Sequence, residues 1–448
     1  MADALDSIFK AYDVRGLYPD EIDESVARRV GNAFVRFTEA STVVVGRDMR
    51  PSSIPLSQAF VEGATLAGAD VVDVGLASTD LVYFASGLLD APAAMFTASH
   101  NPARYNGIKM CRASAAPIGE ATGLLQIKGA VAAGLVERAE EAGRVETRDL
   151  LVEFAAHVRS CVDVSALAAL RVVADTANGM GGLVVPAVFE GTPFELSVLF
   201  GELDGTFPNH PADPIQPENL VALQKAVLDA GADVGLAFDG DADRVFLVDD
   251  RGQPVSGSIT TAIVARGILE RTGPGETVVH NLICSKAVPE VIREMGGTPV
   301  RARVGHSFIK QVMAETGAVF GGEHSAHYYF RDNWRADSGS IAAMVVLEQL
   351  SLAGVPLSEL RGPFERYAQS GEINTEVADP AGVIDRIAAE FAGADQDHLD
   401  GLTVDFGDWW FNLRPSNTEP LLRLNLEASD RAACDAHTDA VLALIRDS

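Results

Sequence analysis

The chain alternates short runs of β-branched residues with alanine-rich amphipathic segments, and this alternation constrains the fold more than any other feature. Residues 42–48 predict a buried strand, residues 55–69 a helix and residues 71–75 a second strand. A helix over 80–89 and a strand over 93–99 continue the pattern. Strand–helix–strand alternation predicts βαβ units around a mainly parallel sheet.

The same pattern restarts near residues 171 and 256, and then the tail changes character. Residues 402–428 predict short alternating strands, and a final helix is expected from about Asp430. A length of 448 residues suggests about three domains of ordinary size. We therefore expect three similar α/β domains and a smaller C-terminal α+β domain. The expected domains are residues 1–147, 148–255, 256–368 and 369–448.

Charge and composition exclude several classes of function. A net charge of −28 argues against nucleic-acid binding and against docking on an anionic membrane, and taken alone it also discourages phosphorylated substrates. The N-terminus has no apolar signal segment, and no stretch approaches the roughly 18 apolar residues of a membrane-spanning helix. The 4 cysteines are too scattered for a disulfide scaffold or a zinc site. We therefore expect a cytoplasmic protein.

Ser99 lies in the hexapeptide TASHNP, at the end of an expected strand. In open α/β sheets, ligands bind beyond the carboxyl ends of the strands, and Pro102 keeps this loop out of helical geometry. A hydroxyl in such a loop can act as a nucleophile or as a phosphate carrier. The alternative is a turn whose Ser, His and Asn side chains make only local hydrogen bonds.

Asp239, Asp241 and Asp243 occupy every second position of the loop DGDADR, which follows an expected strand over 234–238. Unpaired carboxylates this close together repel each other, and a hard divalent cation such as Mg²⁺ relieves that repulsion. An EF-hand is excluded, because Arg244 stands where that loop needs glycine. Two alternatives stay open: a solvated acidic loop, and a phosphatase of the haloacid-dehalogenase type, whose usual pattern Asp243 breaks.

Two later loops carry groups suited to sugar phosphates. Glu323, Ser325 and His327 alternate after an apolar strand, so we expect their side chains to point one way, toward sugar hydroxyls. Arg414 begins the loop RPSNTEP, whose hydroxyls, amide and backbone N–H groups can surround a phosphate. The alternatives are an edge strand with a polar face and an ordinary turn. Further basic residues beside loops, for which surface charge is the alternative, are Lys10, Arg15, Arg47, Lys109, His306 and Lys310.

The motifs FKAYDVRG, TASHNP, DGDADR, GE-x-S-x-H and RPSNTEP occur in this order over nearly the whole chain. In this set and order the sequence closely resembles the α-D-phosphohexomutase superfamily and, within it, the phosphomannomutase/phosphoglucomutase group. The resemblance implies an α/β fold of three similar mixed-sheet domains plus a C-terminal α+β domain, arranged around a central cleft. It implies interconversion of hexose 1-phosphate and hexose 6-phosphate, for mannose first and glucose second, through a phosphoserine.

The resemblance also implies roles residue by residue. Asp239, Asp241 and Asp243 would bind Mg²⁺ together with an oxygen of phosphorylated Ser99. The implied catalytic residues are Ser99, His100, Lys109, Arg15 and His306, with Lys109 or His306 as the proton acceptor. The implied substrate-binding residues are Tyr12, Arg244, Glu323, Ser325, His327, Arg414, Ser416, Asn417, Thr418 and Arg423. Mg²⁺ and hexose 1,6-bisphosphate are the implied cofactors, sugar phosphates are the partners, and a monomer or homodimer is expected.

Departures from the family pattern affect the expected preference for mannose or glucose and leave the expected class of reaction unchanged. His324 stands where mannose and glucose mutases commonly have Met, and Ala326 stands where the family usually has Gly. Ile283 occupies the place of a third-domain lysine, and Lys286 lies close to it without matching. Two other functions stay open: a metal-dependent sugar-phosphate phosphatase that uses Asp239, and a sugar-phosphate-binding protein without activity.

Overall fold

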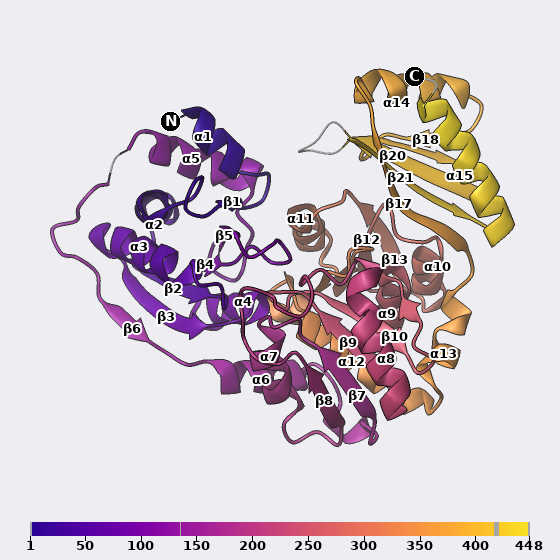
Figure 1. Ribbon diagram of the computed structural model, residues 1–448, viewed down its shortest axis with the longest axis horizontal. Helices are drawn as coiled ribbons and strands as arrows, with labels where there is room; N and C mark the ends of the chain where they lie inside the picture. Colours follow the sequence, from indigo (N-terminus) through magenta and orange to yellow (C-terminus); the bar gives the residue numbers. More distant parts are fainter. Residues whose placement is uncertain (1, 135, 416–420, 447–448) are drawn as a thin grey trace.

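Four β-sheets organise the chain, and we number the units around them domain I to domain IV in chain order (Figure 1). The computed structural model describes residues 2–134, 136–415 and 421–446. Domain I lies at the left of Figure 1, and domain IV lies at the upper right, above domain III. Helices cover the sheets of the first three domains, and two helices pack on the sheet of domain IV.

Domain I contains a six-stranded sheet in the order β1-β5-β4-β2-β3-β6. Strands β4, β2, β3 and β6 run parallel, whereas β5 pairs antiparallel with β4 on one side and with β1 on the other. Its strands are β1 Val14–Leu17, β2 Thr42–Arg47, β3 Asp70–Leu76, β4 Ala93–Phe96, β5 Tyr105–Cys111 and β6 Val145–Thr147. Its helices are α1 Ala2–Ile8, α2 Glu24–Thr38, α3 Ser53–Leu66, α4 Thr79–Leu89, α5 Leu124–Ala132 and the short η1 Glu120–Thr122.

Domains II and III repeat the central strand order of domain I. The sheet of domain II has the order β11-β10-β9-β7-β8, and that of domain III β16-β15-β14-β12-β13. The domain II elements are α6 Leu151–Ser160, η2 Val164–Ala166, β7 Arg171–Asp175, α7 Gly181–Phe189, β8 Glu195–Leu199, η3 Pro217–Leu220, α8 Val221–Ala230, β9 Val234–Phe238, β10 Val245–Asp249 and β11 Pro254–Val255.

The domain III elements are α9 Gly257–Thr272, β12 Thr277–Asn281, α10 Ala287–Glu294, β13 Thr298–Ala302, α11 His306–Thr316, β14 Phe320–Gly322, β15 Tyr328–Phe330, η4 Arg331–Asn333, β16 Ala336–Asp337, α12 Gly339–Ala353, α13 Leu357–Leu360 and η5 Gly362–Phe364. Among the described residues, no single helix is long and apolar enough to cross a membrane. One bent pair of helices, Gly339–Ala353 with Leu357–Phe364, has the length and composition of a membrane span, and this is the only sign of one in that part of the chain. Its first helix, α12, is buried over most of its length.

Domain IV is built on an antiparallel sheet in the order β17-β21-β20-β19-β18. Its elements are β17 Ala368–Glu376, α14 Pro380–Glu390, β18 Asp395–Asp397, β19 Leu402–Asp405, β20 Trp409–Pro415, β21 Leu421–Ala428 and α15 Arg431–Arg446. The α+β character expected of the C-terminal domain is confirmed. The exact domain boundaries stay a prediction.

The mixed sheets expected of the first three domains are confirmed, and the reason for their antiparallel strands lies in three short loops. A parallel crossover needs about a dozen residues, so the loops 97–104, 239–244 and 323–327 allow only a hairpin return. Each loop joins a parallel strand to an antiparallel one at the same place in its sheet: β4 to β5, β9 to β10 and β14 to β15. Three of the four predicted functional loops therefore occupy equivalent positions in three similar domains.

The hydrophobic core explains how these three loops are held together. One continuous cluster of buried residues runs from α4 of domain I through domain II to α9 and α12 of domain III. Domain IV has a separate core, formed by α14, α15 and its own strands. At the border of domains I and III, Ser338 caps α12 and its hydroxyl donates to Asp80 Oδ2 at 2.7 Å. One side of domain I thus shares an interior with domains II and III, while domain I also has a separate core of its own around α2 and α3.

Candidate functional site

Ser99 lies at the centre of the site, in the loop that leaves β4. The expected strand over 93–99 ends at Phe96, because the Ser99 amide donates to Thr97 Oγ1 at 2.8 Å and bends the chain out of the sheet. Ser99 has a left-handed backbone, with φ of 50°. Its hydroxyl donates to Asp239 Oδ2 at 2.8 Å and lies 3.1 Å from His100 Nδ1. The hydroxyl of domain I therefore faces the acidic loop of domain II.

The three aspartates of that loop are buried and close together. Asp239, Asp241 and Asp243 each offer an oxygen within 4.8 Å of the others. The loop turns at Ala242, which has a φ of 60°. Gly240 makes the approach to domain I possible, because a Cβ there would lie 2.4 Å from the carbonyl oxygen of Ser99. The alternative of a solvated acidic loop is wrong for this reason: the loop is packed against the serine loop.

Lys109 neutralises part of this acidic cluster. Its Nζ donates to Asp241 Oδ2 at 2.7 Å and to Asp243 Oδ2 at 2.6 Å. Burial opposes the charge on Lys109, but the two carboxylates outweigh it and raise its pKa well above the usual value. Burial likewise opposes ionisation of Asp241, yet Lys109 and the hydroxyl of Thr79 hold the pKa of that carboxyl well below its usual range.

The acidic cluster also fits a hard divalent cation. Asp241 Oδ1 and Asp243 Oδ1 are buried and have no hydrogen-bond partner among the described residues. A buried polar atom without a partner is costly, so these two oxygens favour a ligand that binds them. Three carboxylates offer only oxygen donors, which Mg²⁺ prefers. Burial raises the pKa of Asp239, and the other two carboxylates add to this rise against the opposing effect of Arg244.

Arg244 and His100 complete the surroundings of Ser99. Arg244 Nε donates to Asp239 Oδ2 at 2.9 Å, and its Nη2 lies 3.5 Å from Ser99 Oγ and donates to His100 Nδ1 at 2.6 Å. Burial, Arg244 and Arg15 hold the pKa of His100 well below its usual value, so its imidazole is neutral. Arg15 approaches from β1 and donates to Asn101 Oδ1 at 2.6 Å. Two cationic side chains thus flank the loop that carries the hydroxyl.

The sugar loop differs from the expected extended strand. Residues 323–327 form a tight turn between β14 and β15, because Ala326 adopts a φ of 66° and its amide donates to the carbonyl of Glu323. The alternation of Glu323, Ser325 and His327 therefore does not point three side chains one way. Gly257 holds the loop from behind, since a Cβ there would lie 2.1 Å from the carbonyl oxygen of His324.

Glu323 is engaged in hydrogen bonds within domain III. Its carboxylate accepts from the hydroxyl of Tyr329 at 2.5 Å, from Asn281 Nδ2 at 3.2 Å and from the amide of Gly305 at 3.2 Å. Ser325 lies nearer the surface, and its Oγ is 3.3 Å from His327 Nδ1. Glu323 thus fixes the entry to α11, while Ser325 and His327 stay at the open side of the turn.

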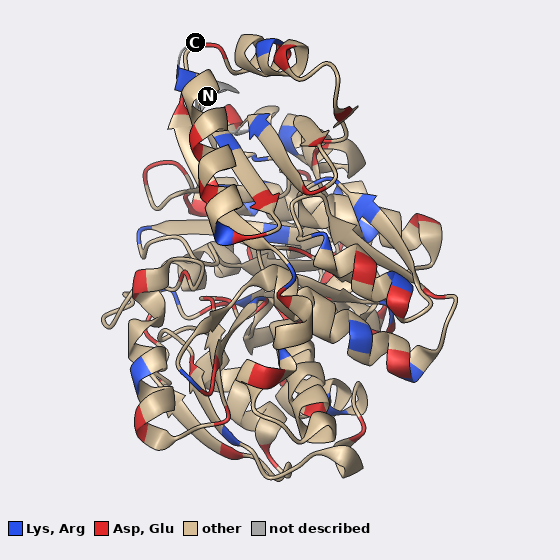
Figure 2. Ribbon diagram, turned by 90° about the vertical axis from the view of Figure 1, so that its right-hand side faces the viewer, with Lys and Arg blue, Asp and Glu red and all other residues tan. Residues whose placement is uncertain are grey.

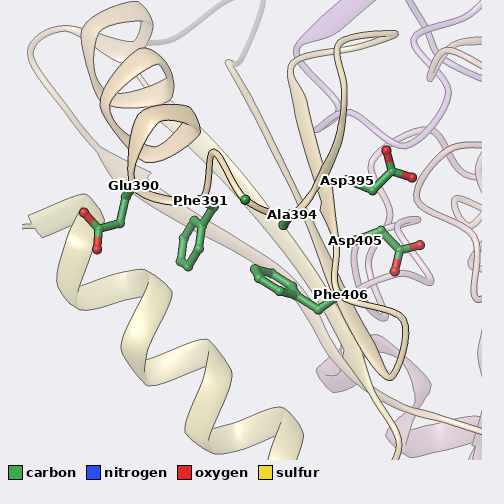
Figure 3. Close-up of a pocket in the computed structure, with 7 residues that line it drawn as sticks. Glu390, Phe391, Ala394, Asp395, Asp405 and Phe406 are labelled. Carbon is green, nitrogen blue, oxygen red and sulfur yellow. The ribbon is translucent and has the colours of Figure 1, made fainter.

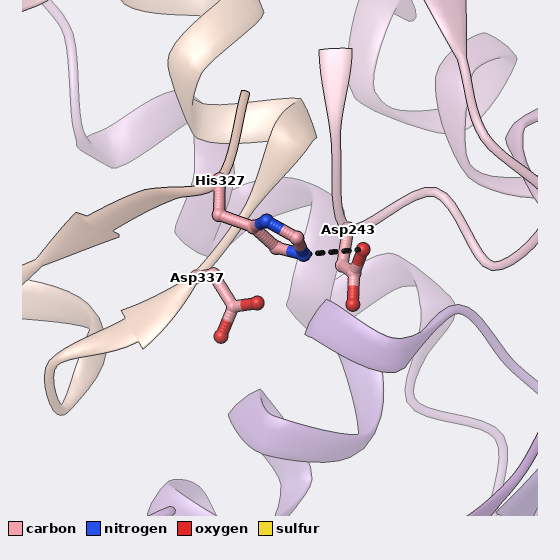
Figure 4. Close-up of side chains that lie close together, drawn as sticks. All are labelled: Asp243, His327 and Asp337. Carbon is pink, nitrogen blue, oxygen red and sulfur yellow. Dashed lines mark ion pairs between the residues drawn. The ribbon is translucent and has the colours of Figure 1, made fainter. Parts of the chain in front are cut away.

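His327 joins the sugar loop to the metal loop (Figure 4). Its Nε2 lies 3.7 Å from Asp243 Oδ1, and its backbone forms a bridge with Arg244. Asp337 lies on the other side of the ring and pairs with Lys310 Nζ at 2.7 Å. Surface charge, the alternative given for Lys310, is wrong. Its side chain is buried, and its Nζ lies over the ring of Tyr83.

Tyr12 and His306 meet where domain I faces domain III. Their ring centroids lie 5.0 Å apart, and the Tyr12 hydroxyl is 3.5 Å from the carbonyl oxygen of Val304. Burial and the Lys310 ammonium lower the pKa of His306 to about 3, so its imidazole is neutral. Burial and Glu323 raise the pKa of Tyr12, and Arg414 is close enough to oppose that rise. The arginine of domain IV therefore faces this part of the cleft.

Arg414 and Arg423 share one carboxylate on β17. Arg414 Nη2 lies 2.9 Å from Glu372 Oε2, and Arg423 Nη1 lies 3.5 Å from Glu372 Oε1. The Nε atoms of both arginines are buried without a hydrogen-bond partner in the parts of the chain that the structure describes. Their guanidinium groups thus keep donors for an anion. Ser416, Asn417 and Thr418 lie outside the described residues.

Lys286 contacts domain IV instead of the centre of the site. Its Nζ donates to Asp405 Oδ1 at 2.7 Å and to the carbonyl oxygen of Gly407 at 2.9 Å. Its amide donates to Glu427 Oε1 at 2.9 Å, and the same oxygen accepts from Trp410 Nε1 at 3.0 Å. Lys286 therefore fixes domain IV against domain III, which agrees with its departure from the family position.

A cavity of about 430 Å³ in domain IV does not fit a phosphorylated ligand (Figure 3). It is lined by Glu390, Phe391, Gly393, Ala394, Asp395, Asp405 and Phe406, which include three carboxylates and no basic side chain. At the serine and metal loops, in contrast, basic side chains accompany the carboxylates, although the whole chain is acidic and Figure 2 shows Asp and Glu positions along helices, strands and loops throughout the molecule. Arg15, Lys109 and Arg244 lie at these two loops, and Arg414 and Arg423 lie on domain IV.

The motifs include the serine loop and the metal loop, and Lys310 is among the basic residues named beside loops, but two buried contributors lie outside the predicted set. Thr79 donates to Asp241 from the start of α4, and Asp337 pairs with Lys310 behind His327. Thr79 and Asp337 lie on α4 and β16, outside the motif loops. The only available signal was that each is a polar residue within or beside an otherwise apolar segment.

Known proteins are similar to this chain over all four of its domains. Family models described as phosphoglucomutase/phosphomannomutase match this chain in four parts: alpha/beta/alpha domain I over residues 6–134, domain II over 152–252, domain III over 256–367 and the C-terminal domain over 372–444. A Xanthomonas campestris protein named for phosphohexose mutases is 41% identical over 443 residues, covering 98% of this chain and 99% of that protein.

Two further comparisons point the same way. A phosphomannomutase of Salmonella typhimurium is 40% identical over 452 residues, covering 98% of each chain. The crystal structure of a phosphoglucomutase/phosphomannomutase family protein from Burkholderia thailandensis has a TM-score of 0.90 at 33% identity, covering 98% of this chain and 97% of that one. Similarity therefore extends over all four domains, in sequence and in fold.

Proposed function

The chain belongs to the phosphoglucomutase/phosphomannomutase family and is a phosphohexose mutase, and we propose that it interconverts the 1-phosphate and 6-phosphate of mannose, with glucose as a second substrate. In this proposal phosphorylated Ser99 carries the group that is transferred. The observation that supports it best is the Ser99 hydroxyl, 2.8 Å from a buried aspartate and beside two orphaned carboxylate oxygens. We also propose domain boundaries after residues 147, 255 and 368.

We assign a Mg²⁺ site to Asp239, Asp241 and Asp243. When bound, this ion would neutralise charge on the phosphoryl group and would favour its transfer. The neighbouring cations have matching roles: Arg244 stabilises negative charge beside Ser99 Oγ, and Lys109 balances the metal loop before substrate arrives.

The reaction proceeds by two phosphoryl transfers, and the second restores the phosphoserine that the first consumes. In the first, the bond between phosphorus and Ser99 Oγ breaks as a bond to the free sugar hydroxyl forms, which gives hexose 1,6-bisphosphate. The bisphosphate turns over in the cleft, and its other phosphoryl group returns to Ser99 Oγ. The sugar is released with its phosphate on the other carbon. Phosphoryl transfer of this kind depends on positioning and charge stabilisation more than on covalent help from other groups.

The sugar hydroxyl must lose a proton as it attacks, and Lys109 and His306 are the two candidate acceptors. Two carboxylates hold Lys109 protonated, so it has no lone pair to offer while it contacts them. His306 is neutral and opens α11 at the border between domains I and III, but its lowered pKa makes its imidazole a weak base. We therefore assign charge stabilisation to Lys109 and keep both residues as candidates for proton acceptance.

Substrate recognition is divided between domains III and IV. Arg414 and Arg423, with Ser416, Asn417 and Thr418, would bind the phosphate that is not being transferred. Ser325 and His327 would face the sugar hydroxyls, and Glu323 would hold the turn that carries them, while Tyr12 and Arg15 would close the domain I side. His324 makes a hydrogen bond of 3.0 Å between its Nδ1 and Ser258, within domain III. This contact explains why its difference from Met leaves the loop intact.

The decisive experiment compares kcat/KM for mannose 1-phosphate and glucose 1-phosphate in Mg²⁺ with a trace of the bisphosphate. Peptide mapping should locate phosphate on Ser99, and Ser99→Ala should abolish turnover. Ser57→Ala, a buried serine of α3 in the same domain, serves as the control and should keep full activity. Full activity of Ser99→Ala would refute the proposal, and release of inorganic phosphate in place of isomerised sugar would favour the phosphatase that uses Asp239.

A further inference from the structure

Arg50 is buried directly behind the serine loop, in the segment that joins β2 to α3. Its side chain has 0% of its surface exposed. A guanidinium group in such a place is costly unless each of its donors is paired. None of the five family motifs contains this residue, and the roles implied for the reaction leave it out.

All five N–H donors of Arg50 have an acceptor. A guanidinium carries five N–H groups in a rigid plane, one on Nε and two on each terminal nitrogen. The acceptors are Asp48 Oδ2 at 3.1 Å from Nε, the carbonyl oxygens of Pro102 at 2.9 Å and Tyr105 at 3.1 Å from Nη1, and the carbonyl oxygens of Ser99 at 2.9 Å and Asn101 at 2.7 Å from Nη2. Four of the five belong to the loop that carries the proposed phosphoserine.

This arrangement fixes Ser99 from two sides. Arg50 holds the Ser99 carbonyl, while Asp239 accepts from the Ser99 hydroxyl. The left-handed φ of Ser99 is a conformation that non-glycine residues rarely adopt, and such a conformation persists only when its surroundings over-determine it. Four carbonyls directed at one planar fork provide that constraint.

Arg50 also links the serine loop to domain II. The ring centroid of Phe207 lies 5.0 Å from Arg50 Cζ, and Gly205 is packed so closely that a Cβ there would lie 2.5 Å from Arg50 Cα. Both residues follow the turn after β8, in the domain that supplies the aspartates. One side chain therefore holds the serine loop and contacts the domain of the metal loop.

We propose that Arg50 is a positioning residue for phosphoryl transfer, which sets the place of Ser99 Oγ relative to the metal loop through the backbone of the loop 99–105. This inference rests on the proposed mutase function. Arg50 touches no reacting atom, so its loss should affect the transfer step more than substrate binding. Lysine keeps the charge but has three donors on one atom, so it cannot meet five acceptors arranged around a plane.

The test is Arg50→Lys in the full-length enzyme, assayed with mannose 1-phosphate, Mg²⁺ and the bisphosphate. A misplacement of about 1 Å at a reacting group can reduce a rate about 100-fold, so we expect a fall in kcat of that order with KM changed less than about twofold. The rate at which the bisphosphate phosphorylates Ser99, followed by intact mass, should fall in parallel. Arg159→Lys is the control, because Arg159 also bridges two backbone carbonyls, of Ala187 and Val188, but from a half-buried position on α6, outside the serine loop.

A purely structural role predicts a different result. In that case Arg50→Lys and Arg159→Lys would lose melting temperature alike, and the folded fraction of each would keep the parental kcat and the parental rate of Ser99 phosphorylation. A folded Arg50→Lys enzyme with kcat within twofold of the parent overturns the proposal, as does a rise in KM at unchanged kcat. If the lysine variant does not fold, Phe207→Ala replaces it; a smaller fall in kcat at unchanged KM is expected there, and unchanged kcat overturns the proposal.

Failure of the proposed function would be recognised separately. The parent enzyme is assayed first, and a parent without mutase turnover refutes the function. Amide hydrogen exchange over residues 99–105 then still decides the role of Arg50. Faster exchange confined to this loop in Arg50→Lys, and absent in Arg159→Lys, supports anchoring of the loop, whereas unchanged exchange refutes it.

Discussion

Lys310→Met should destabilise the protein strongly, because it breaks an ion pair that is almost completely buried. The side chains of Lys310 and Asp337 are 2% and 3% exposed, and Nζ lies 2.7 Å from Oδ1. Nζ also lies 4.0 Å from the ring centroid of Tyr83. Methionine fills the space of the lysine stem but leaves the Asp337 carboxylate buried without its cation. Breaking a buried pair from one side costs about 3–5 kcal/mol, and we expect a loss in that range.

The loss should depend on pH with a definite sign. Burial alone would raise the pKa of Asp337, but Lys310 outweighs it and holds that pKa well below its usual range. In the parent, this lowered pKa stabilises the fold above the unfolded value of about 3.9, and the stabilisation is lost as pH falls below it. Without Lys310, burial raises the pKa of Asp337, so mild acid neutralises the stranded carboxylate. The deficit of the variant should therefore shrink between pH 8 and pH 5.

Calorimetric melting of the parent and two variants at both pH values tests this reasoning. At about 1 °C for each kcal/mol in a chain of 448 residues, Lys310→Met should melt about 3–5 °C below the parent at pH 8. Lys225→Met is the matched control: its i,i+4 partner is Asp229, its side chain is 75% exposed, and no measurable shift is expected. The reasoning fails if the two variants melt within about 2 °C of each other at pH 8, or if the deficit grows on acidification.

Three further outcomes follow from the site. Arg414→Ala should raise KM for the hexose phosphate about 10–100-fold with a smaller change in kcat, because the phosphate contact exists before and during transfer; unchanged KM in steady-state kinetics would contradict this. Treatment with a chelator should abolish turnover and added Mg²⁺ should restore it, whereas activity that survives exhaustive chelation would exclude a metal at the aspartates. Gly240→Ala should lower kcat at least about tenfold, since its methyl group would lie 2.4 Å from the Ser99 carbonyl oxygen; a Gly129→Ala control in α5, which has no such neighbour, should retain the parental kcat.

The sequence was sufficient for the parts of the site that lie in single loops. Ser99 and Asp239 follow buried strands of alternating βαβ units, so their placement beyond the strand ends follows from the pattern. Arg414 likewise ends a strand of the C-terminal sheet. For these residues, local pattern and tertiary position agree.

The parts that could not be predicted depend on contacts between elements far apart in the chain. Arg50 is 49 residues from Ser99, and nothing in the sequence indicates that its donors meet the carbonyls of that loop. The alternation of residues 323–327 gave a wrong orientation, because the left-handed turn at Ala326 replaces the expected strand. Lys310 suggested surface charge, since a single basic residue does not reveal the buried Asp337 that pairs with it.

At Gly240 and Gly257, main chain lies directly against main chain, so the spacing of the three hairpin loops does not depend on which side chains line the cleft. The choice of hexose is thereby separated from the geometry of the reacting groups, two properties that many active sites couple. Under the proposed function, substitutions at positions 324–326 would change which hexose is accepted, while the distance from Ser99 to the aspartates would stay the same. A library aimed at new sugar specificity should therefore randomise the sugar loop and leave these two glycines untouched, because the reaction chemistry is carried over unchanged from one specificity to the next.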